Sequence, residues 1–170
     1  MKRNYYVLLL GLLLAFASCS FTTKNFNNPD KDKLLIEVIT FVLERGHFDP
    51  KQLNDSFSEE VFESYIDRLD PLKRYFYQSD IDEFQKYKYE IDDQLKARDI
   101  TFFNLTYDRL IKRIEETKSI YDEILSKPFD YTIDEEIFVD YVDESFVKNK
   151  KDMKDRWRKQ LKYLSISNYD

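Results

Sequence analysis

The sequence predicts an all-α domain, because it is poor in turn-forming residues and rich in apolar residues at helical spacing. Two glycines and four prolines in 170 residues are too few for a β-rich fold with many tight turns. Charged residues make up 35% and aromatic residues 16%, a mixture that suits amphipathic helices with ring-filled inner faces. A chain of this length has room for about one domain. We therefore expect a compact multi-helix domain with an irregular acidic arm, preceded by a cleaved signal peptide.

The N-terminus is typical of an exported protein. A short basic start is followed by an apolar run over Tyr5–Ala17, which is too short to span a bilayer and fits the core of a signal peptide. Cys19, the one cysteine of the chain, follows two residues after the run in a context similar to a bacterial lipobox, with Phe16 in place of the usual leucine. We predict a lipoprotein signal peptide over 1–18, lipidation of Cys19 and a polar tether over 19–29. The alternative is ordinary cleavage that leaves a free thiol.

Three helices are expected in the first half of the folded part. The first ends at Arg45-Gly46, where glycine favours a left-handed cap. The second starts near Ser56 or Ser58, with capping-box spacing between Ser56 and Glu59, and stops at Asp70-Pro71. The third is capped by Ser79-Asp80. Their expected inner faces are Leu34, Leu35, Val38, Ile39, Phe41 and Val42; Val61, Phe62, Tyr65, Ile66 and Leu69; and Phe84, Tyr87, Ile91 and Leu95, with Lys86, Lys88, Asp92 and Lys96 on the solvated side of the third.

The second half predicts a long helix, an acidic arm and a basic helix. The long helix runs over Thr101–Leu125 and ends before Lys127-Pro128. The arm, 130–144, has seven acidic residues and no Lys or Arg, and we expect it to be irregular. The basic amphipathic helix, 148–162, follows, and we expect it to dock on the arm, although each exposed pair contributes only about 0–1 kcal/mol. The expected inner faces are Phe103, Tyr107, Leu110, Ile114, Thr117, Tyr121 and Ile124 in the long helix, and Met153, Trp157 and Leu161 in the basic one.

Signals of catalysis or metal binding are sparse. His47 is the single histidine, and we expect it to be a turn residue that donates to helix carbonyls. No Gly-x-Ser-x-Gly motif is present, and one cysteine with one histidine excludes a Cys/His zinc cluster. The arm offers hard oxygen ligands for calcium at Asp130, Asp134, Glu136 and Asp140, but it lacks the glycine of an EF-hand loop. We therefore assign no catalytic residue, metal ligand or cofactor. The net charge of −6 argues against nucleic-acid binding, and a membrane-surface role for the basic helix is the weaker alternative.

Three ordered motifs resemble a known family. They are LERGHF at Leu43–Phe48, LDPLKRYF at Leu69–Phe76 running into QSDI at Gln78–Ile81, and DRWRKQLK at Asp155–Lys162. Their order and spacing, with the connector KPFD at 127–130, resemble the helical N-terminal domain of tail-specific (carboxy-terminal-processing, Tsp/Prc-like) peptidases, in the form found in Bacteroidetes-like bacteria. We expect this domain to cover 30–164 and the chain to be truncated over 165–170.

The resemblance implies a non-catalytic scaffold and partner-docking domain of a serine peptidase that cuts exported proteins. In the family, a PDZ domain and a peptidase domain with a Ser-Lys dyad follow the helical domain, and no residue of this chain matches either. The implied partners are those two domains, protein substrates, a lipoprotein adaptor, and a membrane reached through the lipid anchor on the periplasmic side. The alternative function is a stand-alone helical envelope lipoprotein that acts as an adaptor or binding module.

Overall fold

The computed structural model describes residues 29–138, 140–141 and 144–167. The chain divides into two units, Met1–Asp32 and Lys33–Asp170. The described residues of the first unit, 29–32, form the first turn of a helix, and the second unit contains the rest of the structure described below. The predicted signal peptide, Cys19 and most of the tether lie outside the described residues.

Helix α2 (Pro29–Phe41) and the π-helical turn η1 (Val42–Gly46) occupy the segment predicted as the first helix. The expected inner face is wrong, because its six apolar residues are 42–61% exposed and Ile36 is the buried residue instead. Gly46 does not have a positive φ, so the predicted left-handed cap is also wrong. The turn is closed instead by the Lys51 amide, which donates to the Leu43 carbonyl at 2.9 Å.

Helix α3 (Asp55–Leu69) starts just before Ser56, the earlier of the two predicted positions, and ends where Asp70-Pro71 was expected to stop it. Its cap differs from the prediction, since the Asn54 side chain accepts the Phe57 amide at 3.0 Å and no capping box forms at Ser56. The predicted inner face is confirmed: Phe62 and Ile66 are buried, and Val61, Tyr65 and Leu69 pack around them.

The third predicted helix is three short pieces: α4 (Gln78–Phe84), the 3-10 turn η2 (Gln85–Tyr87) and α5 (Ile91–Ala97). All four residues of its predicted stripe still contribute to one core. Asp92, which we expected on the solvated side, is buried. The reason is a contact with α3, because the Ser58 hydroxyl donates to Asp92 at 2.6 Å and accepts the Asp92 amide at 2.9 Å.

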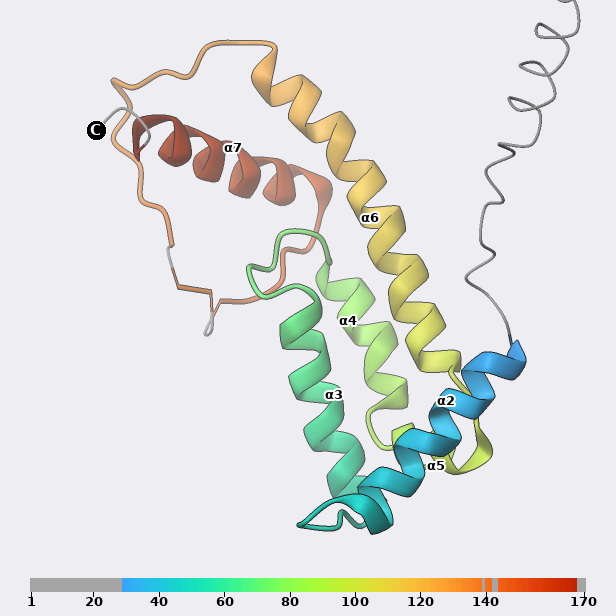
Figure 1. Cartoon of the computed structure of the whole chain (residues 1–170). Coiled ribbons are helices and arrows are strands. Elements are labelled where there is room, and N and C mark those ends of the chain that lie inside the picture. The colour runs from blue at the N-terminus through green and yellow to red at the C-terminus, as the bar shows by residue number, and fades with distance from the viewer. Residues whose placement is uncertain (1–28, 139, 142–143, 168–170) are drawn as a thin grey trace, which may run out of the picture. The chain divides into compact units, whose positions relative to one another are not determined.

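Helix α6 (Thr101–Leu125) has the predicted bounds and packs against α4 (Figure 1). The first half of its predicted inner face is off by one residue: Phe102 and Thr106 are buried, whereas Phe103 and Tyr107 are 50% exposed. Phe102 faces inward because it stacks on Phe62 at 5.5 Å between ring centroids. Phe62 and Phe102 belong to the bundle core, which consists of Phe62, Ile66, Phe76, Ile81, Phe84, Ile91 and Phe102.

Helix α7 (Lys150–Ser167) packs on α6, and a long connection from the end of α6 leads to it (Figure 1). The expected inner residues Met153 and Trp157 are buried and Leu161 packs beside them, as predicted. They belong to the α7 core, which consists of Tyr77, Ile120, Ile124, Val147, Met153 and Trp157. The described residues of the predicted arm are irregular, and those residues of the chain that the structure describes contain no β-strand beyond an isolated Tyr77–Val147 bridge. The all-α prediction is confirmed.

Candidate functional site

The loop after α3 is organised by one buried carboxylate. Asp70, which is 2% exposed, accepts the backbone amides of Arg74, Tyr75 and Phe76 at 2.8–2.9 Å. Lys73 adopts a left-handed backbone with φ of 47°, which lets the chain turn back toward its own carboxylate. Buried amides need acceptors, and a carboxylate is a strong one. The loop 70–77 therefore presents its carbonyls in a fixed geometry.

Helix α7 contacts those carbonyls directly. The Arg156 guanidinium donates to the Lys73 carbonyl at 2.8 Å, and the Trp157 indole N–H donates to the Arg74 carbonyl at 2.9 Å. The Tyr121 ring meets the Trp157 ring edge-on at 4.6 Å between centroids, so α6 supports the same position. Two of the three motifs noted in the sequence, LDPLKRYF and DRWRKQLK, thus meet at one junction. The third, LERGHF, lies outside this junction, on η1 and the turn that follows it.

A buried ion cluster fixes α4 to α6 beneath this junction. Asp80 is fully buried and accepts hydrogen bonds from both Arg109 and Arg113, while Arg113 lies 4.3 Å from the Tyr77 ring centroid. Oδ2 of Asp80 also accepts the Tyr77 amide at 2.9 Å, and this hydrogen bond caps α4. Burial by itself raises the pKa of Asp80, but the hydrogen bonds from Arg113, Tyr77 and Arg109 outweigh burial, so this pKa lies below its usual value.

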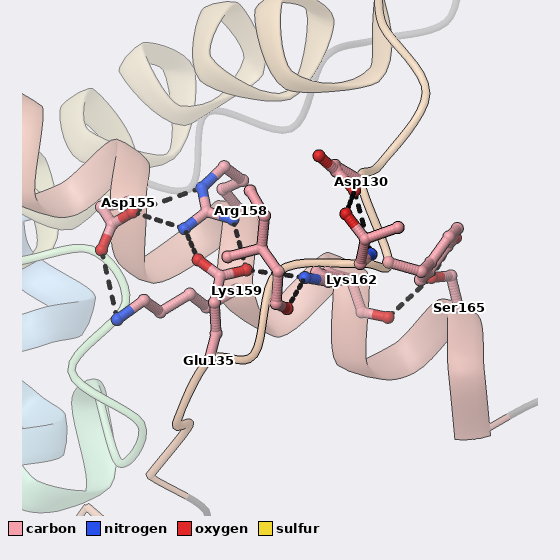
Figure 2. A network of polar contacts seen from close by, with 10 residues as sticks. Asp130, Glu135, Asp155, Arg158, Lys159, Lys162 and Ser165 are labelled. Atoms are coloured by element: carbon pink, nitrogen blue, oxygen red, sulfur yellow. Dashed lines mark hydrogen bonds and ion pairs between the residues drawn. The ribbon is translucent and has the colours of Figure 1, made fainter.

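The segment Asp130–Phe138, which we call the strap, lies along α7 and is held by a second ion cluster (Figure 2). Glu135 accepts hydrogen bonds from both terminal nitrogens of Arg158 and from the Lys162 ammonium at 2.8 Å. Lys162 also donates to the Ile133 carbonyl at 3.0 Å, so one ammonium binds the strap twice. The hydrogen bonds of Arg158 and Lys162 lower the pKa of Glu135 to about 2. The predicted docking of the acidic arm on the basic helix is confirmed at these residues.

Open grooves flank the strap. One, with a volume of about 340 Å³, lies between the strap and the end of α7, where Lys159, Tyr163 and Ile166 line it. Another, of about 430 Å³, lies between the strap and the end of α6, and Lys154 and Arg158 line it. The grooves expose both apolar and charged groups, which suits contact with a peptide or protein segment.

The residues singled out from sequence are placed as follows. His47 is an exposed turn residue, but its Nδ1 lies 2.8 Å from the Asp49 carbonyl, so the expected bond to helix carbonyls is wrong. Cys19 lies outside the described residues. In the described ranges, no group of three or more His, Cys, Asp or Glu side chains is arranged to hold a metal ion. Sequence reasoning named Asp70 and Asp80 as helix-end residues but missed that both are buried acceptors, and it did not single out Glu135.

No described helix combines the length and apolar character needed to cross a membrane.

These features define the class of the protein. It is an all-helical domain in which the loop 70–77 contacts α7, an ion cluster joins α4 to α6, and the strap lies along α7. The family model described as the tail specific protease N-terminal domain matches residues 39–170. The "Tail-specific protease" of Haemophilus influenzae is 31% identical over 134 residues, which cover 78% of this chain and 19% of that protein. The chain belongs to the family of tail-specific protease N-terminal domains. It spans about one fifth of the length of the curated relative that it matches.

Proposed function

We propose that this chain is the non-catalytic helical domain of a periplasmic carboxy-terminal-processing serine peptidase, in which it scaffolds the catalytic parts and docks protein partners. The observation that carries the proposal is the match of residues 39–170 to the family of tail-specific protease N-terminal domains. The partners of the proposal are the PDZ and Ser-Lys peptidase domains of such an enzyme, its protein substrates and a lipoprotein adaptor.

The environment of Ser58 supports a non-catalytic role. This serine lies near a lysine through a shared carboxylate, since Ser58 and Lys96 both donate to Asp92 at 2.6 Å. Ser58 is fully buried, however, and its oxygen already accepts the Asp92 amide. A nucleophile has to reach a substrate carbonyl and transfer its proton to a base. Ser58 instead joins α3 to α5.

A cleavage assay tests the non-catalytic part of the proposal. The purified chain is incubated with an unfolded protein that has an apolar C-terminus, and the Haemophilus influenzae protease serves as the positive control. We expect no turnover by the chain, because buried Ser58 cannot reach a substrate carbonyl. Cleavage by the chain that is lost on Ser58→Ala would overturn the proposal.

A chimera tests the scaffold role. In the Haemophilus influenzae protease, the 134 matched residues are replaced by those of this chain or are deleted. We expect the chimera to keep measurable cleavage and the deletion variant to lose it, because the domain positions the rest of the enzyme. A chimera that carries Asp80→Ala is the matched control and should lose activity as the bundle loosens. Full activity of the deletion variant would contradict a scaffold role and favour a separate adaptor.

We further propose that Cys19 carries a lipid anchor that faces the periplasm. The proposal is supported by the lipobox-like residues that precede this cysteine. A single acyl chain binds membranes only weakly, and several are needed for stable attachment. We expect Cys19→Ala to move the protein from the membrane to the soluble fraction after cell disruption. A wild-type protein that is fully soluble would contradict the anchor.

A further inference from the structure

The strap is held on α7 mainly by polar groups. Three of its four large apolar side chains, Tyr131, Ile133 and Phe138, are 53–60% exposed, and the fourth, Ile137, is half-buried. Apolar anchors lie just outside it, where Phe129 packs against the α7 core and Tyr141 is 6% exposed. The nine residues of the strap are bonded to α7 chiefly through Glu135, through the Ile133 carbonyl and through the Tyr131 hydroxyl, 3.0 Å from Ser165 Oγ.

Arg158 and Lys162, which bind Glu135, form a binding site for a carboxylate. Arg158 and Lys162 are four residues apart on α7, so they lie on one face of the helix and converge on one carboxylate. The Arg158 guanidinium contacts both carboxylate oxygens, the two-pronged geometry in which arginine binds carboxylates best. Lys162 is 7% exposed, and lysine is rarely so buried unless it is paired. Without a carboxylate here, Lys162 would remain a buried cation with few partners.

We propose that this face of α7 is a binding site for an acidic, extended peptide segment of a protein partner, and that the strap occupies the site as an internal substitute. The strap itself shows the chemistry of the ligand: a glutamate for Arg158 and Lys162, and a backbone carbonyl two residues earlier for Lys162. The inference deepens the docking role proposed above and rests on it only for the existence of a partner.

The interactions that hold the strap make such an exchange feasible. The Arg158–Glu135 pair is only partly buried, with 33% of the Arg158 side chain exposed, so salt screens this pair, whereas Lys162 is held by a buried contact. An incoming carboxylate replaces Glu135 and leaves neither cation unpaired. Neighbouring cations extend the same row, since Lys154 lies four residues before Arg158, where it pairs with Glu123 of α6. A longer acidic segment would therefore find a further cation along the helix.

The test uses the strap sequence as its own probe. A fluorescent peptide DYTIDEEIF, which copies residues 130–138, is titrated into the full chain up to about 1 mM, the weak end of specific association. Three chains are compared by anisotropy: the wild type, Glu135→Gln and the matched control Glu136→Gln. The control changes a neighbouring glutamate that forms no ion pair with the described residues of α7. We expect Glu135→Gln to bind the peptide at least tenfold more tightly than the wild type, and Glu136→Gln to behave like the wild type.

Two further measurements locate the binding. Adding Arg158→Gln to the Glu135→Gln chain should abolish the gain, and a peptide with glutamine at the position of Glu135 should bind at least tenfold more weakly. Unchanged thermal unfolding of both variants would show that the fold is retained. Equal affinities for Glu135→Gln and Glu136→Gln, or no binding by any chain, would overturn the inference. Binding of anionic lipid vesicles in place of the peptide would also overturn it. These outcomes do not depend on the cleavage or chimera assays, so failure of one proposal is distinguishable from failure of the other.

Discussion

The bundle core and the strap hold their positions by different interactions. In the bundle core, Phe76 and Phe84 are fully buried and their rings meet edge-on at 5.3 Å between centroids. In the strap, the apolar side chains are mostly exposed, and the ion pairs of Glu135 with Arg158 and Lys162 make the main contact with α7. Apolar burial involves no ionisable group, whereas ion pairs are screened by salt and are lost when the carboxylate is protonated. We therefore expect the bundle to set the stability of the domain and the strap to respond to solution conditions and ligands.

The largest effect is expected from emptying the bundle core. Phe84→Ala removes a fully buried ring and should lower the free energy of unfolding by about 3–5 kcal/mol. The matched change in the strap, Phe138→Ala, removes a ring that is 60% exposed and should change this free energy by less than about 0.5 kcal/mol. Urea titration followed by circular dichroism measures both. Similar losses for the two variants would remove the contrast between the regions.

The buried ion cluster should come next. Asp80→Ala leaves Arg109 and Arg113 without their shared carboxylate and should lower the free energy of unfolding by about 3 kcal/mol. The control Asp82→Ala changes an exposed carboxylate two residues away and should cost less than about 0.5 kcal/mol. An Asp80→Ala chain as stable as the control would show that this carboxylate is not needed to hold α4 on α6.

A smaller effect is expected at the loop junction. Asp70→Asn keeps the shape of the side chain but replaces one acceptor oxygen by an amide donor, which then faces the amides of the loop 70–77. A buried amide without an acceptor costs about 2 kcal/mol, and we expect a loss of that size in the same urea titration. Exposed Asp67 on α3 supplies the control, Asp67→Asn. A negligible loss would mean that the loop conformation does not depend on this carboxylate.

The smallest change in global stability should come from protonating the strap. The pKa of Glu135 is lowered from 4.5 to about 2, so its contribution is complete above about pH 4.5 and is lost as the pH falls toward 2. The carboxyl carbon of Glu135, followed by NMR, should titrate near pH 2 in the wild type and at higher pH in Arg158→Gln. Global unfolding should scarcely follow this titration. A titration midpoint of Glu135 near pH 4.5 in the wild type would show that its ion pairs with Arg158 and Lys162 are absent in solution.

Local signals in the sequence were sufficient for several helix ends, but they indicated the wrong buried face in α2 and in the first half of α6. The bounds of α6 were predicted at Thr101–Leu125 because a proline follows closely, and a proline disfavours helix in the residue before it. Its first half, however, carries apolar residues on two overlapping helical faces, at Phe102 and at Phe103. Two residues of α3 select the face of α6 that is buried. The Phe62 ring stacks on Phe102, and the Tyr65 hydroxyl lies 2.9 Å from Thr106 Oγ1. The apolar stripe of α2 was equally clear in the sequence, yet it is exposed.

The charged residues of the site show the same division. Sequence pattern predicted an acidic arm and a basic helix that attract each other, but it could not single out Glu135 among seven acids, or Asp80 and Asp92 as buried groups. Their partners lie far away along the chain: 33 residues separate Asp80 from Arg113, and 34 separate Asp92 from Ser58.

The sequence by itself determined the helical class, most helix ends and the family, because these depend on residues within a few positions of one another and on ordered motifs. The tertiary structure decided which apolar faces are buried, which carboxylates lie inside and which glutamate ties the strap to α7. Burial and ion pairing depend on surfaces that only the packed chain brings together. Local spacing does not specify which distant residues will be in contact.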